Sequence, residues 1–97
     1  MTRGLIVLHP YATQIITGDK TEEYRDRPPP PGVIGSTIYL LSGGYALGTI
    51  KITWAEPGIW HVRVVERFDV PRKYEHPKGA QVWVRDVLFG PRPTLGE

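Results

Sequence analysis

The chain has 97 residues, of which 40% are hydrophobic and 23% charged, and its formal net charge is +2 at pH 7. A chain of this length builds one core, so we expect a single domain spanning residues 1–97. The absence of cysteine excludes a disulfide scaffold and a thiolate zinc site, and it favours a reducing, cytoplasmic location. The apolar run from Leu5 to Leu8 is too short to cross a bilayer, so we expect no membrane association.

The N-terminal segment predicts a strand followed by a short helix. Leu5 to Leu8 are consecutive apolar residues, which indicates a buried strand. Pro10 suits the first turn of a helix, and the apolar positions of YATQII fall on one helical face. Gly18 is a natural left-handed stop, so the helix is predicted over residues 10–17.

The next segment concentrates five charged side chains between Asp19 and Arg25 and then ends in the prolines Pro28 to Pro31. The run KTEEYR predicts a strand, because side chains alternate between two faces. One face carries Thr21, Glu23 and Arg25, and the other carries Lys20, Glu22 and Tyr24. The prolines cannot donate backbone hydrogen bonds, so they form an extended connector that leads into a glycine turn.

The middle of the chain is rich in strand-forming residues. Thr37 to Ser42 and Tyr45 to Pro57 are predicted strands, and Gly43-Gly44 between them is a hairpin signal. Gly48 lies inside the second strand, which indicates a bulge or a close backbone approach.

Two further strands are predicted, over residues 60–70 and 80–89, and residues 90–97 form a loose tail without a core-forming pattern. One strand, one helix and then four or five strands favour an α+β fold, a small open β-barrel with one short helix near the N-terminus. We expect most of the large aromatic residues in the core and one or two of them free to stack on a base.

Lys20, Glu23 and Arg25 are the candidates for chemistry, because carboxylate and cationic groups held close together form acid/base or anion-binding sites. The spacing leaves a second reading open, in which these side chains form an exposed strand face with ion pairs worth under ~1 kcal/mol each. The three histidines lack the spacing of metal ligands, so no metal and no cofactor are expected.

The segment HPYATQIITGDKTEEYRDRP resembles the signature of the ASCH domain family, which carries a pattern close to G-x-K-x-x-E-x-R after its first helix. Gly18, Lys20, Glu23 and Arg25 fit that pattern position by position. The resemblance continues through IYLLS and ALGTIKI to YEHPKGAQVWV, and it covers roughly Leu5 to Val84. It implies a PUA-like barrel of about five to six strands, with RNA or a nucleoside bound in a cleft between the helix and the barrel.

The resemblance also implies roles for individual residues. Lys20 contacts a phosphate or carbonyl oxygen or acts as a base, Glu23 accepts from an amine or a ribose hydroxyl, and Arg25 holds Glu23 or pairs with phosphate. The other ligand-binding residues are Thr21, Ser42, Tyr74 and His76, and a basic rim is formed by Arg72, Lys73 and Lys78. Because strict alternation separates Lys20 from Glu23, a shared cavity requires Lys20 to lie in the turn before the strand.

Activity differs among the similar proteins. Some are amidohydrolases that remove the acetyl group of 4-acetylcytidine with a lysine, a threonine and a glutamate, others are reported as ribonucleases, and many are only predicted RNA binders. Here Lys20 matches the lysine, whereas Glu23 stands at the position of the threonine. Glu66 is a candidate for the separate glutamate, and Thr21 for a hydroxyl group. The expectations are therefore a binding module for RNA or a modified nucleoside, a hydrolase on the same ligands, or a protein-interaction domain.

Overall fold

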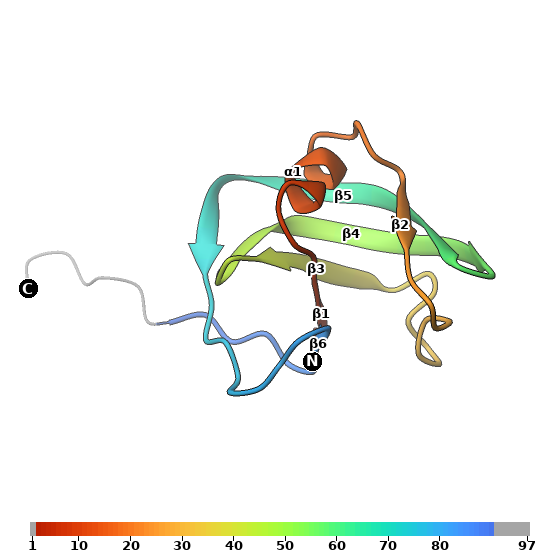
Figure 1. Ribbon diagram of the computed structural model, residues 1–97. Helices are drawn as coiled ribbons and strands as arrows, with labels where there is room; N and C mark the ends of the chain where they lie inside the picture. Colours follow the sequence, from red (N-terminus) through yellow and green to blue (C-terminus); the bar gives the residue numbers. More distant parts are fainter. Residues whose placement is uncertain (1, 91–97) are drawn as a thin grey trace, which may run out of the picture.

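The computed structural model describes residues 2–90, which form one sheet of six strands and one short helix near the N-terminus (Figure 1). The elements are β1 (Gly4–Ile6), α1 (Tyr11–Ile16), β2 (Glu22–Tyr24), β3 (Thr37–Ser42), β4 (Tyr45–Glu56), β5 (Ile59–Lys73) and β6 (Trp83–Val84). The predicted α+β open β-barrel is confirmed. Of the predicted tail, residues 91–97 lie outside the described residues.

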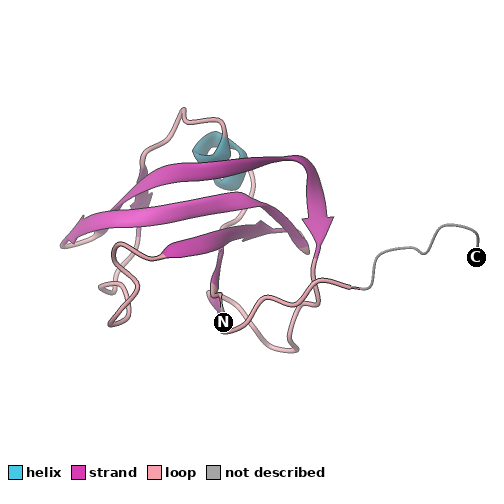
Figure 2. Ribbon diagram, turned by 180° about the vertical axis from the view of Figure 1, so that it is seen from behind, coloured by secondary structure: helices cyan, strands magenta, loops and turns pink. Residues whose placement is uncertain are grey.

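The sheet has the strand order β2-β5-β4-β3-β1-β6. β1 runs parallel to β3, and the other neighbours are antiparallel. The three long strands β3, β4 and β5 form the wall of the barrel, and the short strands β2 and β6 are its edges (Figure 2). The sheet curls so far that its two edges approach each other. Just after β2, Nη2 of Arg25 donates across this opening to the carbonyl oxygen of Ile6 in β1 at 3.1 Å. We call this opening, between residues 20–30 on one side and residues 6–8 and 81–83 on the other, the seam.

The main core lies between the curled sheet and α1. The helix buries Ala12, Ile15 and Ile16, whose i, i+3, i+4 spacing forms one apolar face, and it contacts β3, β4 and β5. The sheet contributes fully buried side chains to the same core, namely Leu5, Leu40, Ile50 and Ile52. Packing on this core fixes the end of the helix beside β2, where the charged stretch begins.

The two glycine predictions for the middle of the chain hold. Gly43 and Gly44 have φ values of 59° and 87° and join β3 to β4 as a two-residue hairpin loop. The pairing of β4 with both neighbours shifts register around Gly48. A Cβ atom at Gly48 would collide with the backbone carbonyl of Glu66 and with the side chain of Ile16. This position is therefore both a bulge and a close backbone approach.

The first strand and the helix differ slightly from their predicted bounds. β1 covers Gly4–Ile6 instead of residues 5–8. Val7 is still buried and its N–H donates to Leu41, but Leu8 is 75% exposed, because the chain there leaves the sheet to reach α1. The helix is one residue shorter than predicted at each end, with Pro10 and Thr17 as its caps.

Three other strands needed correction. β2 covers only Glu22–Tyr24 of the predicted run over residues 20–25. β5 extends beyond residues 60–70, because Arg72 and Lys73 still pair with β4. The predicted strand over residues 80–89 is wrong in length, since β6 has only two residues. Val84 and Val87 are both buried, and residues three positions apart cannot share one face of a regular strand.

Within residues 2–90, no helix has the length and apolar character needed to cross a membrane.

Candidate functional site

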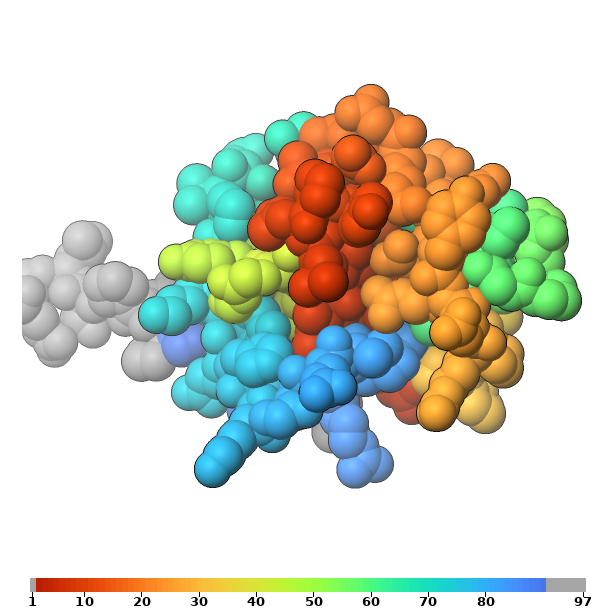
Figure 3. Space-filling model, in the orientation of Figure 1, coloured from red at the N-terminus to blue at the C-terminus, as the bar shows by residue number. Residues whose placement is uncertain are grey.

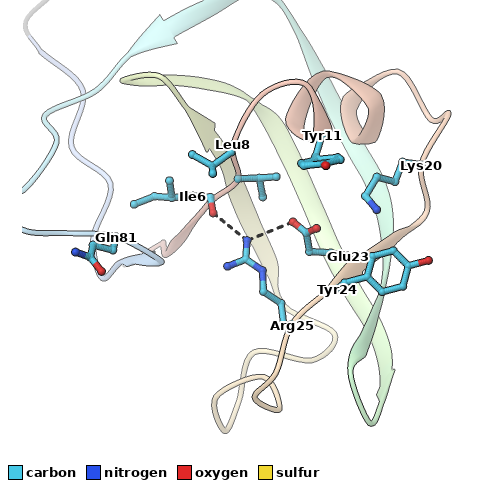
Figure 4. Close-up of a pocket in the computed structure, with 9 residues that line it drawn as sticks. Ile6, Leu8, Tyr11, Lys20, Glu23, Tyr24, Arg25 and Gln81 are labelled. Atoms are coloured by element: carbon cyan, nitrogen blue, oxygen red, sulfur yellow. Dashed lines mark hydrogen bonds and ion pairs between the residues drawn. The ribbon is translucent and has the colours of Figure 1, made fainter.

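A cavity of about 560 Å³ opens in the seam. In the space-filling view, the red N-terminal segment lies between the orange segment that contains β2 and the blue segment that leads to β6 (Figure 3). The cavity is lined by Ile6, Val7, Leu8, Tyr11, Lys20, Glu23, Tyr24, Arg25 and Gln81. We call it the seam cavity; Figure 4 shows Lys20, Glu23, Tyr24 and Arg25 on its β2 side and Gln81 on the opposite side.

Lys20 reaches the seam cavity because it precedes the regular strand. Gly18, with φ of 87°, ends the helix, and the N–H of Lys20 donates to the carbonyl oxygen of Gln14 at 3.0 Å. The backbone at Lys20 is thus held against the helix end and is not paired in β2. The geometric condition from the sequence is met, since Lys20 and Glu23 line the same cavity.

Two tyrosine rings flank the ammonium group of Lys20. Its Nζ lies 4.6 Å from the ring centre of Tyr24 and 5.6 Å from that of Tyr11, distances at which the ring face attracts a cation. Tyr11 is 51% exposed and Tyr24 is 64% exposed. Both rings therefore combine contact with Lys20 and a surface that a ligand can reach.

Glu23 is the buried charge of the site. It is 7% exposed, and its Oε2 accepts a hydrogen bond from Nη2 of Arg25 at 3.2 Å. No hydrogen bond engages Oε1 among the described residues, where every fully buried side-chain nitrogen or oxygen has a partner. Oε1 is therefore accessible from the seam cavity. The pair presents one free carboxylate oxygen beside a cation.

The hydroxyl of Tyr24 is tied to its neighbour on the strand. It donates to Oε2 of Glu22 at 3.2 Å. The negative charge of Glu22 raises the pKa of Tyr24 above its ordinary value of 10.0, and the hydrogen bond and slight burial act in the same direction. The ring thus stays neutral around pH 7.

Sequence reasoning missed Tyr11, Tyr24 and Gln81 as lining residues. For the tyrosines a signal existed, since Tyr24 lies within the charged motif and Tyr11 begins the helix that precedes it. Gln81 carries no such signal, because only the curling of the sheet brings it across the seam.

Four of the predicted ligand-binding residues do not line the seam cavity, and Thr21 and Ser42 are two of them. Thr21 is exposed and lines a different, smaller cavity that it shares with Lys20. Ser42 is buried at the end of β3, beside the Gly43-Gly44 turn. Neither residue is among those that line the seam cavity.

Tyr74 and His76 form a separate structural pair. The Tyr74 hydroxyl lies 2.7 Å from Nδ1 of His76, and Nε2 of His76 lies 3.0 Å from the carbonyl oxygen of Ala80. Because a carbonyl oxygen can only accept, Nε2 donates to Ala80, and in the neutral imidazole Nδ1 then accepts from the Tyr74 hydroxyl. Burial raises the pKa of the Tyr74 hydroxyl. The Tyr74 ring belongs to a second core cluster with Val84 and Val87, away from the seam cavity.

The predicted basic rim does not surround the seam cavity. Arg72 and Lys73 end β5, whereas β2 pairs with the other end of that strand, residues 59–61. The guanidinium carbon of Arg72 lies 3.9 Å from the ring centre of Phe89, so this side chain packs on an aromatic ring. Lys78 is exposed in the loop before β6, and Glu66 is exposed on β5.

No group of three or more His, Cys, Asp or Glu side chains in the described part of the chain is arranged to hold a metal ion. A search with known family models found none that matches the chain, and no curated protein matches it.

Proposed function

We propose that this protein is an ASCH-type domain that binds RNA or a modified nucleoside in the seam cavity. The observation that carries the proposal is that Lys20 and the Glu23–Arg25 pair line one cavity together with two tyrosine rings. Its volume of about 560 Å³ falls in the range of small-ligand sites. The resemblance of the G-x-K-x-x-E-x-R segment to the ASCH family supports the same three residues.

The polar groups suit the hydrogen-bonding edge of a base. Oε1 of Glu23 can only accept, and Nζ of Lys20 can only donate. The edge of cytosine offers the complementary pair, since its exocyclic amine donates and its ring carbonyl accepts. Glu23 therefore selects a base with an amine, and Lys20 pairs with a carbonyl or phosphate oxygen.

The remaining surfaces of the cavity suit the faces of a flat ring. Tyr11 and Tyr24 offer exposed aromatic surface, and Ile6 to Leu8 form the opposite, apolar wall. Stacking on aromatic side chains contributes about 1–3 kcal/mol per base in single-stranded nucleic acid binding. Polar reading of the edge and stacking on the face are the two means by which proteins recognise unpaired bases.

Calorimetric titration of the protein with cytidine, 4-acetylcytidine and uridine tests the proposal. Lys20→Ala should weaken binding at least about tenfold, because one charge-assisted hydrogen bond is worth roughly 1.5–3 kcal/mol. The melting temperature should change little, since Lys20 does not belong to the core. Lys51→Ala on β4 is the matched control, because Lys51 lies outside the seam cavity. Absence of nucleoside binding, or equal affinities in the two variants, would contradict the proposal.

A second candidate is amide hydrolysis of an acylated cytidine, which is favoured by Lys20 and Glu23 lining one cavity. Glu23 would take a proton from a water molecule as that water attacks the acetyl carbonyl carbon. The carbon–nitrogen bond then breaks, and the proton passes to the leaving amine, which gives cytidine and acetate. Incubation with 4-acetylcytidine and mass spectrometry tests this step. Cytidine should form with the natural protein and not with Glu23→Gln; no release by either protein leaves binding as the function.

A further inference from the structure

A second cavity, of about 440 Å³, lies in the seam beside the first. It is lined by Arg25, Asp26, Arg27, Pro28, Pro30, Trp60, Val82 and Trp83. Arg25 borders both cavities, and Gln81 of the first is followed in the chain by Val82 of the second. The two cavities are therefore neighbours along the seam with one guanidinium group between them.

The second cavity offers an aromatic surface with few polar groups. The ring centres of Trp60 and Trp83 are 5.9 Å apart with an interplanar angle of 29°, so the indoles are stacked. Nε1 of Trp60 donates to the carbonyl oxygen of Arg27 at 2.9 Å, which fixes that ring. Proline and valine side chains complete the apolar lining. Trp60 is buried in the main core and supports Trp83, whose partly exposed ring can accept a flat ring by stacking whatever the identity of the base.

Cationic groups lie between and beside the cavities. The Nη2 atom of Arg25 is engaged by Glu23 and by Ile6, which orients the guanidinium group in the seam. Arg27 is exposed at the border of the second cavity, and Asp26 is the only acidic residue in its lining. Because Glu23 already pairs with Nη2 of Arg25, the groups that suit a phosphate here are the exposed guanidinium of Arg27 and the N–H groups of Arg25 on its other nitrogen atoms.

We propose that the seam binds a dinucleotide unit of single-stranded RNA, with one base in each cavity and the linking phosphate at Arg25 and Arg27. This inference rests on the proposed function, because it takes the seam cavity as the site of the first base. It specifies the substrate as a segment of a strand instead of a free nucleoside. The first base is read by Glu23 and Lys20, and the second contributes affinity by stacking on Trp83, which the buried Trp60 supports.

The test combines calorimetric titration, which gives the affinity of every probe, with fluorescence titration of a Trp54→Phe protein, which reports on the second cavity. The chain has three tryptophans, so this exchange leaves the two in the second cavity as reporters. The probes are cytidine, cytidine monophosphate, and the dinucleotides cytidylyl-adenosine and adenylyl-cytidine, because the direction of the strand is to be found. One dinucleotide should bind about tenfold more tightly than the monophosphate and quench the fluorescence, as expected for one added stacked base.

Val82→Glu is the decisive variant, because Val82 is 39% exposed and lines only the second of the two cavities. The introduced glutamate places a carboxylate beside the proposed phosphate position. It should lower the affinity of the preferred dinucleotide to about that of the monophosphate and leave cytidine binding unchanged. Val65→Glu, at an exposed valine on β5 outside both cavities, should bind every probe like its parent. Cytidine binding without a gain for either dinucleotide, or a gain that Val82→Glu does not remove, overturns this inference and leaves the proposed function standing. If neither cytidine nor a dinucleotide binds, both fail.

Discussion

Arg25 and Glu23 form a salt bridge of 3.2 Å at the seam, and the same nitrogen atom of Arg25 donates to the carbonyl oxygen of Ile6. One guanidinium group thus neutralises a buried carboxylate and links β2 to β1. The opening of the barrel and the charge of its cavity depend on the same residue. Loss of Arg25 should therefore affect stability as well as binding.

We expect Arg25→Ala to lower the free energy of unfolding by about 2 kcal/mol. The change leaves Glu23 largely buried without its partner, which costs 3–5 kcal/mol for a fully buried pair and less here, because the Arg25 side chain is 22% exposed. Urea denaturation measures the effect. Arg27→Ala, two residues along the chain and exposed, should cost under about 0.5 kcal/mol.

Combining Arg25→Ala with Glu23→Gln should recover part of the lost stability, since the amide no longer needs a positive partner. Equal losses for Arg25→Ala and Arg27→Ala would show that the salt bridge and the link to Ile6 do not hold the seam together.

Gly48→Ala should destabilise the protein by about 3 kcal/mol, because the new Cβ would overlap the carbonyl of Glu66 and the end of Ile16. The backbone of β5 cannot move away without breaking its pairing with β4. Thermal unfolding followed by circular dichroism measures the loss. Gly90→Ala is the matched control, since no atom lies within 4 Å of a Cβ there. A melting temperature equal to that of the control would mean that β5 yields at this point.

The sequence predicted the elements of this fold better than their ends. Alternation and glycine signals are local, so the helix, the β3–β4 hairpin and the Gly48 bulge could be read from it. The length of β6 could not be predicted, because the apolar residues Val84 and Val87 fit both a long strand and an irregular segment. Only their packing in the second core cluster decides where the strand ends. The register of β5 around its bulges depends equally on tertiary contacts.

The candidate site shows the same limit. Lys20, Glu23 and Arg25 lie close together in sequence, so it could be predicted from this segment alone that they line one cavity. Tyr74 and His76 are also close in sequence, but Tyr74 is hydrogen-bonded to His76, and His76 to the carbonyl oxygen of Ala80. Which charged or polar groups face the seam is set by how the two sheet edges meet. The approach of the two edges depends on the tertiary structure of the whole sheet and cannot be predicted from one segment.

Tyr74→Phe separates a structural role of Tyr74 from ligand binding. We expect a loss of about 1 kcal/mol, because Nδ1 of His76 loses its donor, and we expect no change in nucleoside affinity. Tyr45→Phe, at an exposed tyrosine, should change neither quantity. Denaturation and calorimetry on the same samples give both values. Weaker ligand binding with unchanged stability would instead assign Tyr74 to the site.

Alkaline titration tests the link between Tyr24 and Glu22. Removing the charge in Glu22→Gln should lower the pKa of Tyr24 toward 10.0, because that charge is the largest cause of its rise. Ultraviolet absorbance of tyrosinate measures this shift. Because the chain has five tyrosines, the Tyr24→Phe variant identifies the part of the titration curve that belongs to Tyr24.

The same link predicts how stability depends on pH. The folded state holds the Tyr24 proton more tightly than the unfolded chain, so this contribution to stability is complete below the unfolded pKa of about 10 and is lost as pH rises through the folded value. The natural protein should therefore lose stability relative to Glu22→Gln above pH 10, and the two proteins should run parallel at neutral pH. If the difference between them stays constant across that alkaline window, the hydroxyl of Tyr24 does not feel the charge of Glu22.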